Sequence, residues 1–427
     1  MRFTLLSIFT GITAAVFVSM SSVAEVPAKP TFTKDVLPIL QENCQTCHRP
    51  LGANLSGMVA PMSLISYKEV RPWAKAISKV VSDKTMPPWH ASEKLHGVFR
   101  NERTLTETEI ATLVKWVEMK APRGNPKDAP EPKSFPETGW NFGEPDLVVN
   151  FDEPYFVADE VEDLYHNIQV ELTKEQLPAE KWIKQIEFRP GSEVVHHIIG
   201  YATPIGGDGS GISAREGEQT RGMLGGMAPG TEDADWPEGF GIVLKPDSMI
   251  TFAMHYHKES GPGTGRMDSS AIGVVFHDEP VKHPVEISTI GHGSFEIPPG
   301  VNYWHVGASR TFDEDTILIS MLPHMHLRGK AATYTAFYPD GTTEVLLDVP
   351  EYDFNWQTQY DLEVNKVLPA GTRIEMDLIY DNSKANAEGI GFNPDRAVRF
   401  GGPTTDEMDL AWITIAPAKP VSQTAGD

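Results

Sequence analysis

The stretch ILISMLPHMHLRGKA, residues 317–331, is an apolar run that ends in His324-Met325-His326. Successive side chains of a β-strand point to opposite faces, so residues two apart project to the same side. If this run is a strand, the imidazoles of His324 and His326 face the same way. The pattern then fits either two ligands of one metal ion or two histidines on a solvated face.

Short apolar runs of the same kind fill the chain from residue 146 onward, and clusters of Gly, Pro, Asn and Asp separate them. Such spacing is typical of antiparallel β-sandwiches and jelly rolls. The region is large for a single sandwich, so we expect two domains of this kind. One spans 146–285 and the other spans 286–420.

The only two cysteines of the chain, Cys44 and Cys47, stand in the motif Cys-Gln-Thr-Cys-His that ends at His48. This is the C-x-x-C-H signature of c-type haem attachment, in which the histidine becomes the proximal iron ligand. A redox-active C-x-x-C pair and half of a zinc site are the alternatives. A zinc site needs further cysteines or histidines at ligand spacing, and the sequence has no second pair. The motif therefore predicts covalently bound haem c and leaves no cysteine for a structural disulfide.

Helical patterns surround the haem motif. Residues 66–83 have a helical pattern, and Thr106 and Glu109 have the spacing of a capping box. The apolar residues that follow repeat at i, i+3, i+4 and i+7. We therefore expect an all-α cytochrome c domain over 30–123 and a Pro-rich linker over 124–145. The predicted fold is thus multidomain, with this all-α domain preceding two antiparallel β-sandwich, jelly-roll-like domains.

Three methionines downstream of the motif are candidates for the sixth ligand of the iron: Met58, Met62 and Met86. Met86 begins the sequence MPPWH, whose two prolines would hold a loop over the haem face. This setting resembles the axial-methionine loop of small cytochromes c, so we prefer Met86, with Met62 second and His90 as a further candidate. Methionine ligation raises the reduction potential and suits electron transfer. The alternative for each methionine is simple packing in a core.

The N-terminal segment 1–24 has the features of a secretory signal. Arg2 precedes an apolar stretch over 5–20, and small residues end at Ala24. An uncleaved membrane anchor is the alternative. No later segment has an apolar run long enough to span a bilayer, so we expect a periplasmic or secreted protein. The formal charge of −23 makes nucleic acid a poor partner.

Three pairs of histidines occur in the β-rich region. They are His196 with His197, His255 with His257, and His324 with His326. A single histidine on a strand is usually packed or solvated, but three close pairs at apolar runs favour a metal site. Clustered imidazole without cysteine suits copper, zinc, iron or nickel, and an added thioether favours copper because soft sulfur stabilises Cu(I).

In these pairs, and in the segment GGPTTDEMDLAW at 401–412, the region resembles the copper type II, ascorbate-dependent monooxygenases. This is the family of peptidylglycine α-hydroxylating monooxygenase and dopamine β-monooxygenase. The resemblance implies two β-sandwich domains that each bind one copper ion. The implied ligands of the electron-transfer copper are His196, His197 and His255. The implied ligands of the catalytic, O2-activating copper are His324, His326 and Met408.

The resemblance also implies an activity. The three-histidine copper would deliver an electron, and the other copper would activate O2 beside the substrate, so that one oxygen atom enters the substrate and the other leaves as water. The expected enzyme is therefore a copper-dependent monooxygenase acting on O2 and a small organic substrate. Because the haem motif lies in the same chain, we expect haem c to relay electrons from a periplasmic or membrane donor to the copper centres.

The chain departs from the family at the substrate pocket. Where peptide-hydroxylating members have an arginine that grips the substrate carboxylate, this chain has Leu322, and Leu410 and Trp412 replace a helper Asn and Tyr. Loss of that clamp argues against peptidylglycine and predicts a more apolar pocket. The family is usually rich in disulfides, which this chain lacks the cysteines to form. His257 competes with His255 as the third ligand, and the match to the family's His-Tyr motif favours His255.

Two other functions fit parts of the pattern. A copper-binding protein without turnover, such as a metallochaperone, a copper sensor or an electron-transfer cytochrome, would also need clustered ligands. The six ligands in order, with a thioether at an open site, argue against this alternative. A zinc hydrolase is the second alternative, but the sequence has no evident Glu or Asp in a hydrolase motif.

Overall fold

The computed structural model describes most of the chain. The described residues are 25–50, 60, 62–135, 139–205, 222–228, 231 and 234–421. The predicted signal segment 1–24 and the candidate haem ligand Met58 lie outside the described residues. In the described part of the chain, no helix is long and apolar enough to cross a membrane.

The fold class expected from the sequence, an all-α cytochrome c domain before two antiparallel β-sandwich domains, is wrong. The chain is mostly β, with 38% strand and 15% helix, and its small sheets form a propeller-like arrangement without a large all-α domain at the N-terminus. The longest helix among the described residues, α4, has 12 residues. Helical periodicity indicates where helices form but does not give their lengths. Prolines such as Pro38, Pro72 and Pro87 limit the length of the helices, because proline cannot occupy a helix interior without disrupting it.

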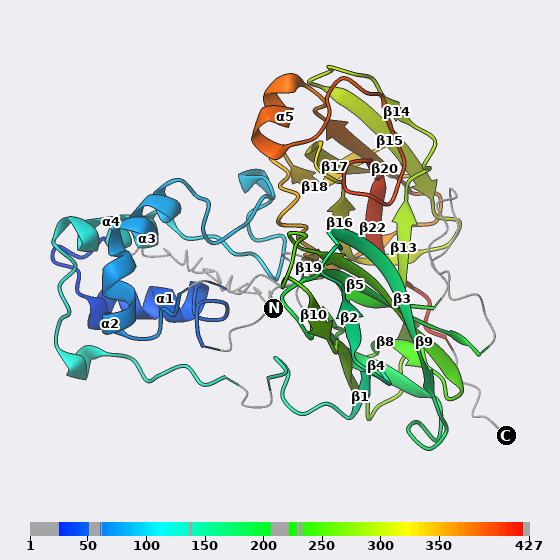
Figure 1. Ribbon diagram of the computed structural model, residues 1–427, viewed down its shortest axis with the longest axis horizontal. Coiled ribbons are helices and arrows are strands. Elements are labelled where there is room, and N and C mark those ends of the chain that lie inside the picture. Colours follow the sequence, from blue (N-terminus) through cyan, green and yellow to red (C-terminus); the bar gives the residue numbers. More distant parts are fainter. Residues whose placement is uncertain are drawn as a thin grey trace, which may run out of the picture.

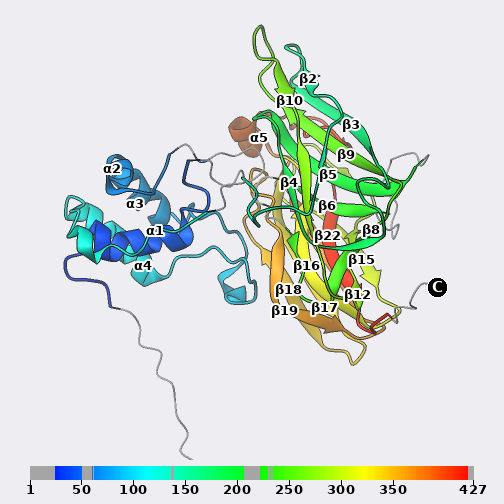
Figure 2. The same cartoon turned by 90° about the horizontal axis from the view of Figure 1, so that it is seen from below.

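The N-terminal helices lie together beside the β region (Figures 1 and 2). They are η1 (Phe32–Val36), α1 (Leu37–Asn43), α2 (Tyr67–Val70), η2 (Arg71–Trp73), α3 (Ala74–Ser82), η3 (Glu93–Leu95), α4 (Glu107–Glu118) and η4 (Pro126–Asp128). A small apolar core joins several of them and includes Phe32, Leu40 and Trp116. The expected capping box is confirmed, because Thr106 and Glu109 hydrogen-bond each other's backbone N–H at the start of α4.

Strands dominate the rest of the described chain. Those up to residue 284 are β1 (Leu147–Asn150), β2 (Tyr155–Val157), β3 (Asp163–Leu172), β4 (Lys181–Arg189), β5 (Val195–Pro204), β6 (Met223–Met227), β7 (Ala234–Asp235), β8 (Phe240–Leu244), β9 (Ser248–His257), β10 (Arg266–Asp268), β11 (Ala271–Phe276) and β12 (His283–Pro284). Those that follow are β13 (Glu286–Ile290), β14 (Glu296–Ile297), β15 (Trp304–Thr311), β16 (Thr316–His324), β17 (Gly329–Phe337), β18 (Thr343–Val349), β19 (Tyr360–Leu368), β20 (Arg373–Tyr380), β21 (Val398–Arg399) and β22 (Leu410–Pro417), with helix α5 (Lys384–Ile390) between β20 and β21.

Four sheets contain most of these strands. Their orders are β1-β11-β4-β8-β12 with β7 beside β4, β3-β9-β5-β6, β13-β22-β16-β19, and β15-β20-β17-β18. The first two sheets share one apolar core, which includes Ile198 and Phe252. The last two share a second core, which includes Leu318 and Met321. Two further sheets have two strands each, β2 with β10 and β14 with β21.

Strand β16 explains why its sequence is apolar on both faces. Leu318 and Met321 are buried in the second core, whereas Ile317 and Ile319 are buried in the first core. A strand that is buried on both sides has no solvated face and therefore appears as a continuous apolar run rather than an alternating one. This position brings the end of β16 close to the sheet that contains β5 and β9.

The segment between α3 and α4 packs on the β region. Trp89 contacts Tyr360 of β19 edge-to-face, with 5.0 Å between ring centroids. Phe99 pairs with Leu362, and the backbone N–H of Glu363 donates to the carbonyl of Val98 at 2.9 Å. Part of the sequence predicted for the haem domain therefore contributes to the second β core instead.

Candidate functional site

Three histidines meet on the sheet formed by β3, β9, β5 and β6. His197 of β5 is the cross-strand partner of His255 of β9. The register shifts between Val195 and His197, which is a β-bulge. Adjacent side chains of a regular strand point to opposite faces, and a bulge re-aims one of them. The bulge thus explains how His196 and His197, although neighbours in the chain, both approach His255.

The geometry of this cluster fits a metal ion. One ligand atom from each of the three residues lies within 4.8 Å of the others. The Nδ1 atom of His197 is 3.4 Å from Nδ1 of His196 and 3.2 Å from Nδ1 of His255. Imidazole nitrogens that bind one ion at about 2.0–2.1 Å in a tetrahedral arrangement are separated by roughly 3.3 Å. The three side chains therefore have the spacing of a preformed ligand set.

Asp163, at the start of β3, hydrogen-bonds to one histidine of the cluster and holds its ring in place. Its carboxylate accepts a short hydrogen bond from Nε2 of His255, which leaves Nδ1 of His255 facing the other two rings. Burial alone would raise the pKa of Asp163, but the hydrogen bonds from His255 and His257 outweigh it and hold that pKa well below its usual range. A carboxylate in this position fixes the tautomer and orientation of a metal-binding histidine.

His257 does not join the cluster. Its side chain is half-exposed, and its Nδ1 lies 3.7 Å from the carboxylate of Asp163. That contact raises the pKa of His257, whereas a metal ligand must be neutral. Of the two histidines that competed for the third position, the structure brings His255 next to His196 and His197.

The imidazoles on β5 are held in the neutral form. Burial, followed by the neighbouring His255, lowers the pKa of His196 to about 3. The same causes lower the pKa of His197 well below its usual range. Desolvation disfavours a charged ring and nearby like charges add to the effect. Neutral rings keep a lone pair that a metal ion can bind.

The second pair of histidines lies at the end of β16. His324 is the last residue of the strand and His326 follows just beyond it, with 5.3 Å between ring centroids. Met325, between them, is fully buried in the second core. The two imidazoles therefore project away from that core, as the alternation of side chains predicts.

Hydrogen bonds leave the same ring nitrogen of each histidine available. Nδ1 of His324 donates to the side-chain oxygen of Gln357 at 2.6 Å, and Nδ1 of His326 donates to the carbonyl of Asp406 at 3.3 Å. Nε2 is the remaining nitrogen in both rings. Burial lowers the pKa of His324 to about 4 and that of His326 to about 3. This pair also offers neutral imidazoles to a metal ion.

Met408 lies in the loop before β22, and its neighbour Glu407 ties this loop to the histidine pair. The buried carboxylate of Glu407 accepts from the backbone N–H groups of His326 and Arg328, both at 2.7 Å. Burial outweighs these bonds and raises the pKa of Glu407 to about 8. The hydroxyl of Tyr380 donates to the carbonyl of Met408 at 2.7 Å. The backbone around the thioether is therefore anchored from two sides.

One cavity of about 400 Å³ connects the two clusters. It lies between the sheet of β5 and β9 and the sheet of β16 and β22, which are neighbours in both views (Figures 1 and 2). The predicted ligands that line it are His197, His324, His326 and Met408. Phe354 stacks on His196, with 5.5 Å between ring centroids, and contacts His326 edge-on at 6.1 Å. The two predicted metal sites therefore border the same space.

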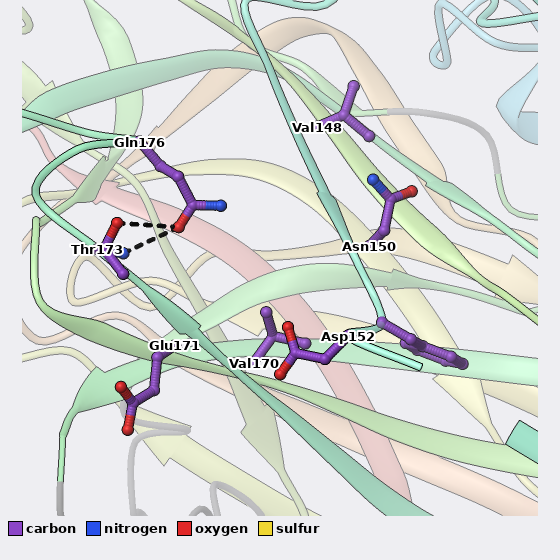
Figure 3. Close-up of a pocket in the computed structure, with 8 residues that line it drawn as sticks. Val148, Asn150, Asp152, Val170, Glu171, Thr173 and Gln176 are labelled. Atoms are coloured by element: carbon purple, nitrogen blue, oxygen red, sulfur yellow. Dashed lines mark hydrogen bonds between the residues drawn. The ribbon is translucent and has the colours of Figure 1, made fainter. Parts of the chain in front are cut away.

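A second depression has a different character. It lies at β1 and β3 and is lined by side chains that include Asn150, Asp152, Glu171 and Gln176 (Figure 3). The side-chain oxygen of Gln176 accepts from both the hydroxyl and the backbone N–H of Thr173. None of the predicted ligands lines this depression, so it is separate from the predicted metal sites.

At the N-terminal motif, His48 is oriented as an axial ligand needs to be. Its Nδ1 donates to the carbonyl of Met62 at 3.3 Å, which leaves Nε2 for a metal. Burial and the proximity of Cys47 raise the pKa of Cys44 to about 12, so that residue is a neutral thiol. Neither cysteine takes part in a disulfide, as thioether attachment to haem requires. The residues of the motif therefore fit haem c.

The structure separates the candidates for the sixth ligand. Met62 packs with Cys44 against the N-terminal core. Met86 is half-buried in the loop after α3, where its backbone N–H bonds the carbonyl of Val80. His90 lies near Asp353 of the β region, between Trp89 and Ala91, which pack on the second β core. His90 therefore faces the β region, and the choice between Met86 and Met62 stays a prediction.

Comparisons with known proteins do not identify a family. No protein-family profile matches the chain, and no curated protein matches it. The major capsid protein P2 of bacteriophage PM2 aligns with 65% of this chain and 98% of its own length, at 10% identity and a TM-score of 0.26. Empty particles of cowpea mosaic virus align with 66% of this chain and 92% of their own, at 9% identity and a TM-score of 0.27. A Paenibacillus xanthan lyase aligns with 70% of this chain and 28% of its own, at 12% identity and a TM-score of 0.18. Likenesses this weak support no conclusion about fold or function.

Sequence reasoning missed the residues that support the ligands. Asp163, Gln357, Glu407 and Phe354 all contact predicted ligands, yet none of them was a candidate. Only Glu407 carried a signal, because it adjoins Met408 in the sequence. Asp163 and Gln357 are 92 and 33 residues from the histidines they bond, so only the folded chain brings them together.

Proposed function

We propose that this chain is a copper-dependent monooxygenase that uses O2 to hydroxylate a small organic substrate. The observation that carries the proposal is one cavity that both predicted ligand sets reach, with His197 of the three-imidazole set on one side and His324, His326 and Met408 on the other. A protein that only carries or senses copper has no need for an organic pocket between its ligands. Imidazole with a thioether favours copper over zinc.

The side chains have separate roles in this proposal. Copper, when bound, would supply the one-electron and O2 chemistry that side chains cannot perform. Asp163 keeps Nδ1 of His255 available, and Gln357 keeps Nε2 of His324 available. Glu407 holds the backbone of His326 against the loop that carries Met408. Apolar walls, including Trp412, would keep an organic substrate out of bulk water.

The proposal includes the N-terminal motif as a haem c site. Cys44 and Cys47 would hold the porphyrin and His48 would be the proximal ligand, with Met86 as the preferred sixth ligand. A covalent one-electron carrier in the same chain would connect the copper centres with a periplasmic or membrane donor. The periplasmic or secreted location of the protein belongs to the same proposal.

Anaerobic copper titration of the purified full-length protein tests the copper sites. We expect two Cu(I) ions per chain, with carbon monoxide binding at one of them. In a separate aerobic assay with an added one-electron reductant, we expect oxygen consumption with some neutral small organic molecules. Met408→Ala should weaken the second site and abolish carbon monoxide binding without changing the first. Full copper content and full activity in that variant would refute the assignment of Met408. Two coppers without oxygen consumption would instead favour the electron-transfer or sensing alternative.

Absorption spectroscopy tests the haem assignment independently of copper. The pyridine haemochrome spectrum should be that of haem c, and His48→Ala should remove the low-spin signature. Met86→Ala should change the axial ligation, whereas Met62→Ala is its matched control. Loss of the methionine signature only in the Met62 variant would reverse the preference. If O2 and substrate leave the reduced haem unoxidised in copper-loaded protein, the relay is refuted.

A further inference from the structure

We infer that the cavity between β5 and β16 binds an uncharged, elongated and mostly apolar molecule with a hydrogen-bond acceptor at one end. Calling this molecule the substrate rests on the proposed function. Its polarity and orientation, in contrast, follow from the two walls of the cavity alone.

The wall on the β13-β22-β16 side consists of three successive cross-strand rows. Ser320 pairs with Thr414, Leu322 pairs with Trp412, and His324 pairs with Leu410. All six side chains line the cavity, because residues two apart on a strand share a face. Along this wall the side chains therefore change from hydroxyl-bearing, through apolar, to a row that contains an imidazole.

The hydroxyl row provides a buried donor. Ser320 and Thr414 are 2% and 7% exposed, and the Ser320 hydroxyl donates to Oγ1 of Thr414 at 2.7 Å. The Thr414 hydroxyl then keeps its own hydrogen, which can point into the cavity that Thr414 lines. Because a buried hydroxyl gains from a partner, a carbonyl or ether oxygen of a ligand is the complementary group.

The middle row and the opposite wall exclude charge. Leu322 and Trp412 line the cavity together with Ile199 and Met223 of the other sheet. Among the described residues that line the cavity there is no Asp, Glu, Lys or Arg. In the copper-free protein, an ionised ligand would lose its hydration here without gaining a partner of opposite charge from the described lining residues, so these walls select a neutral molecule.

The rows also set the length and orientation of the ligand. Ser320 and His324 are four residues apart on β16, which corresponds to roughly 13 Å of strand at about 3.3 Å per residue. A cavity of about 400 Å³ is at the small end of the range for ligand pockets. A molecule whose oxygen meets Thr414 would lay its apolar body over Leu322 and Trp412 and direct its far end to His324.

A matched pair of probes tests this inference in the wild-type protein. Isothermal titration calorimetry of the copper-free full-length chain would compare the neutral ketone 4-phenyl-2-butanone with the anion 4-phenylbutanoate. We expect the ketone to bind and the carboxylate to bind on the order of 100-fold or more weakly, since its charge has no partner. Equal or tighter binding of the carboxylate, or no binding of the ketone, would overturn the inference.

Two variants locate the binding mode. Thr414→Val should weaken the ketone by about 3- to 10-fold, which is the loss of one hydrogen bond. Leu322→Arg should weaken the ketone and strengthen the carboxylate, while Val364→Arg, at an exposed position of β19, should change neither. Unchanged ketone binding in Thr414→Val would refute the proposed orientation, even if Leu322→Arg fails to fold.

Failure of this inference is distinguishable from failure of the proposed function. Copper stoichiometry reports on the function, and binding of the ketone to copper-free protein reports on the cavity. If the protein binds the ketone but no copper, the cavity is a pocket for neutral organic molecules and the proposed monooxygenase function is refuted. If the protein binds two copper ions but not the ketone, the proposed function stands and the inferred class of substrate is refuted.

Discussion

The three-histidine cluster is built inside a sheet, whereas the second predicted ligand set, His324, His326 and Met408, comes from a strand end and a loop that line one cavity. In the first cluster the cross-strand register and one bulge set the side chains, and Nδ1 atoms face one another. In the second cluster Nδ1 is occupied by Gln357 or a carbonyl, so Nε2 is the free nitrogen. The first cluster is thus preformed by backbone pairing, and the second depends on loop residues that hold it in place.

The largest expected effect comes from removing a ligand of the preformed cluster. His255→Ala should lower copper affinity at the first site by more than the roughly 100-fold that follows loss of a supporting hydrogen bond, and leave the second site intact. His257→Ala is the matched control and should retain two coppers per chain. Competition with a Cu(I) chelator measures both affinities. A retained first site in His255→Ala would show that His257 is the ligand.

The next effect concerns the carboxylate behind the first cluster. Asp163→Asn should weaken the first copper site by about 10- to 100-fold, because the amide no longer enforces the tautomer that presents Nδ1 of His255. The second site should be unchanged, since Asp163 contacts only the first cluster. The same chelator competition measures the change. An equal loss at both sites would contradict the separation of the two clusters.

Glu407→Gln tests the loop-dependent cluster. The amide can accept only one of the two backbone hydrogen bonds that Glu407 accepts, so we expect a loss of about 1–3 kcal/mol in the free energy of unfolding and weaker copper binding at the second site only. Glu388→Gln, on the exposed side of α5, is the control and should change stability by less than about 0.5 kcal/mol. Urea unfolding and copper titration together provide the readout. Unchanged copper binding at the second site would show that Glu407 supports the fold alone.

The smallest expected effect lies between the clusters. Phe354 contacts one imidazole of each cluster, and such ring contacts contribute about 0.5–1.5 kcal/mol. Phe354→Leu should therefore weaken both copper sites by no more than about 10-fold, with a similar factor at each. A change confined to one site would show that Phe354 belongs to that cluster alone.

Local sequence patterns predicted several features of the fold and site correctly. The capping box at Thr106 is formed, the β-rich composition after residue 146 is confirmed, and β16 ends at the histidine pair. These features depend on residues close in the chain, so short-range periodicity and spacing are sufficient to predict them. The copper and haem assignments remain predictions, since no ion or cofactor tests them.

These local patterns did not predict the size of the helical region or the packing of segments far apart in the chain. The N-terminal region is a set of short helices rather than a large all-α domain, and its segment around Trp89 and Phe99 packs on β19 instead. Helical periodicity contains no information on which distant surface will cover an apolar side chain. For the same reason, the sequence of β16 predicts a strand but does not predict which sheets bury its two faces.

The sequence by itself predicted which residues would carry the proposed chemistry: the C-x-x-C-H motif, the histidine pairs and Met408. It did so because the chain has only two cysteines and because the local spacing of the histidines is informative. Only the tertiary structure decided that His255 rather than His257 meets His196 and His197, that Asp163 and Glu407 hydrogen-bond to predicted ligands, and that residues of both predicted ligand sets line one cavity. These facts depend on strand register, a bulge and the packing of two sheets, which arise between residues far apart in the chain.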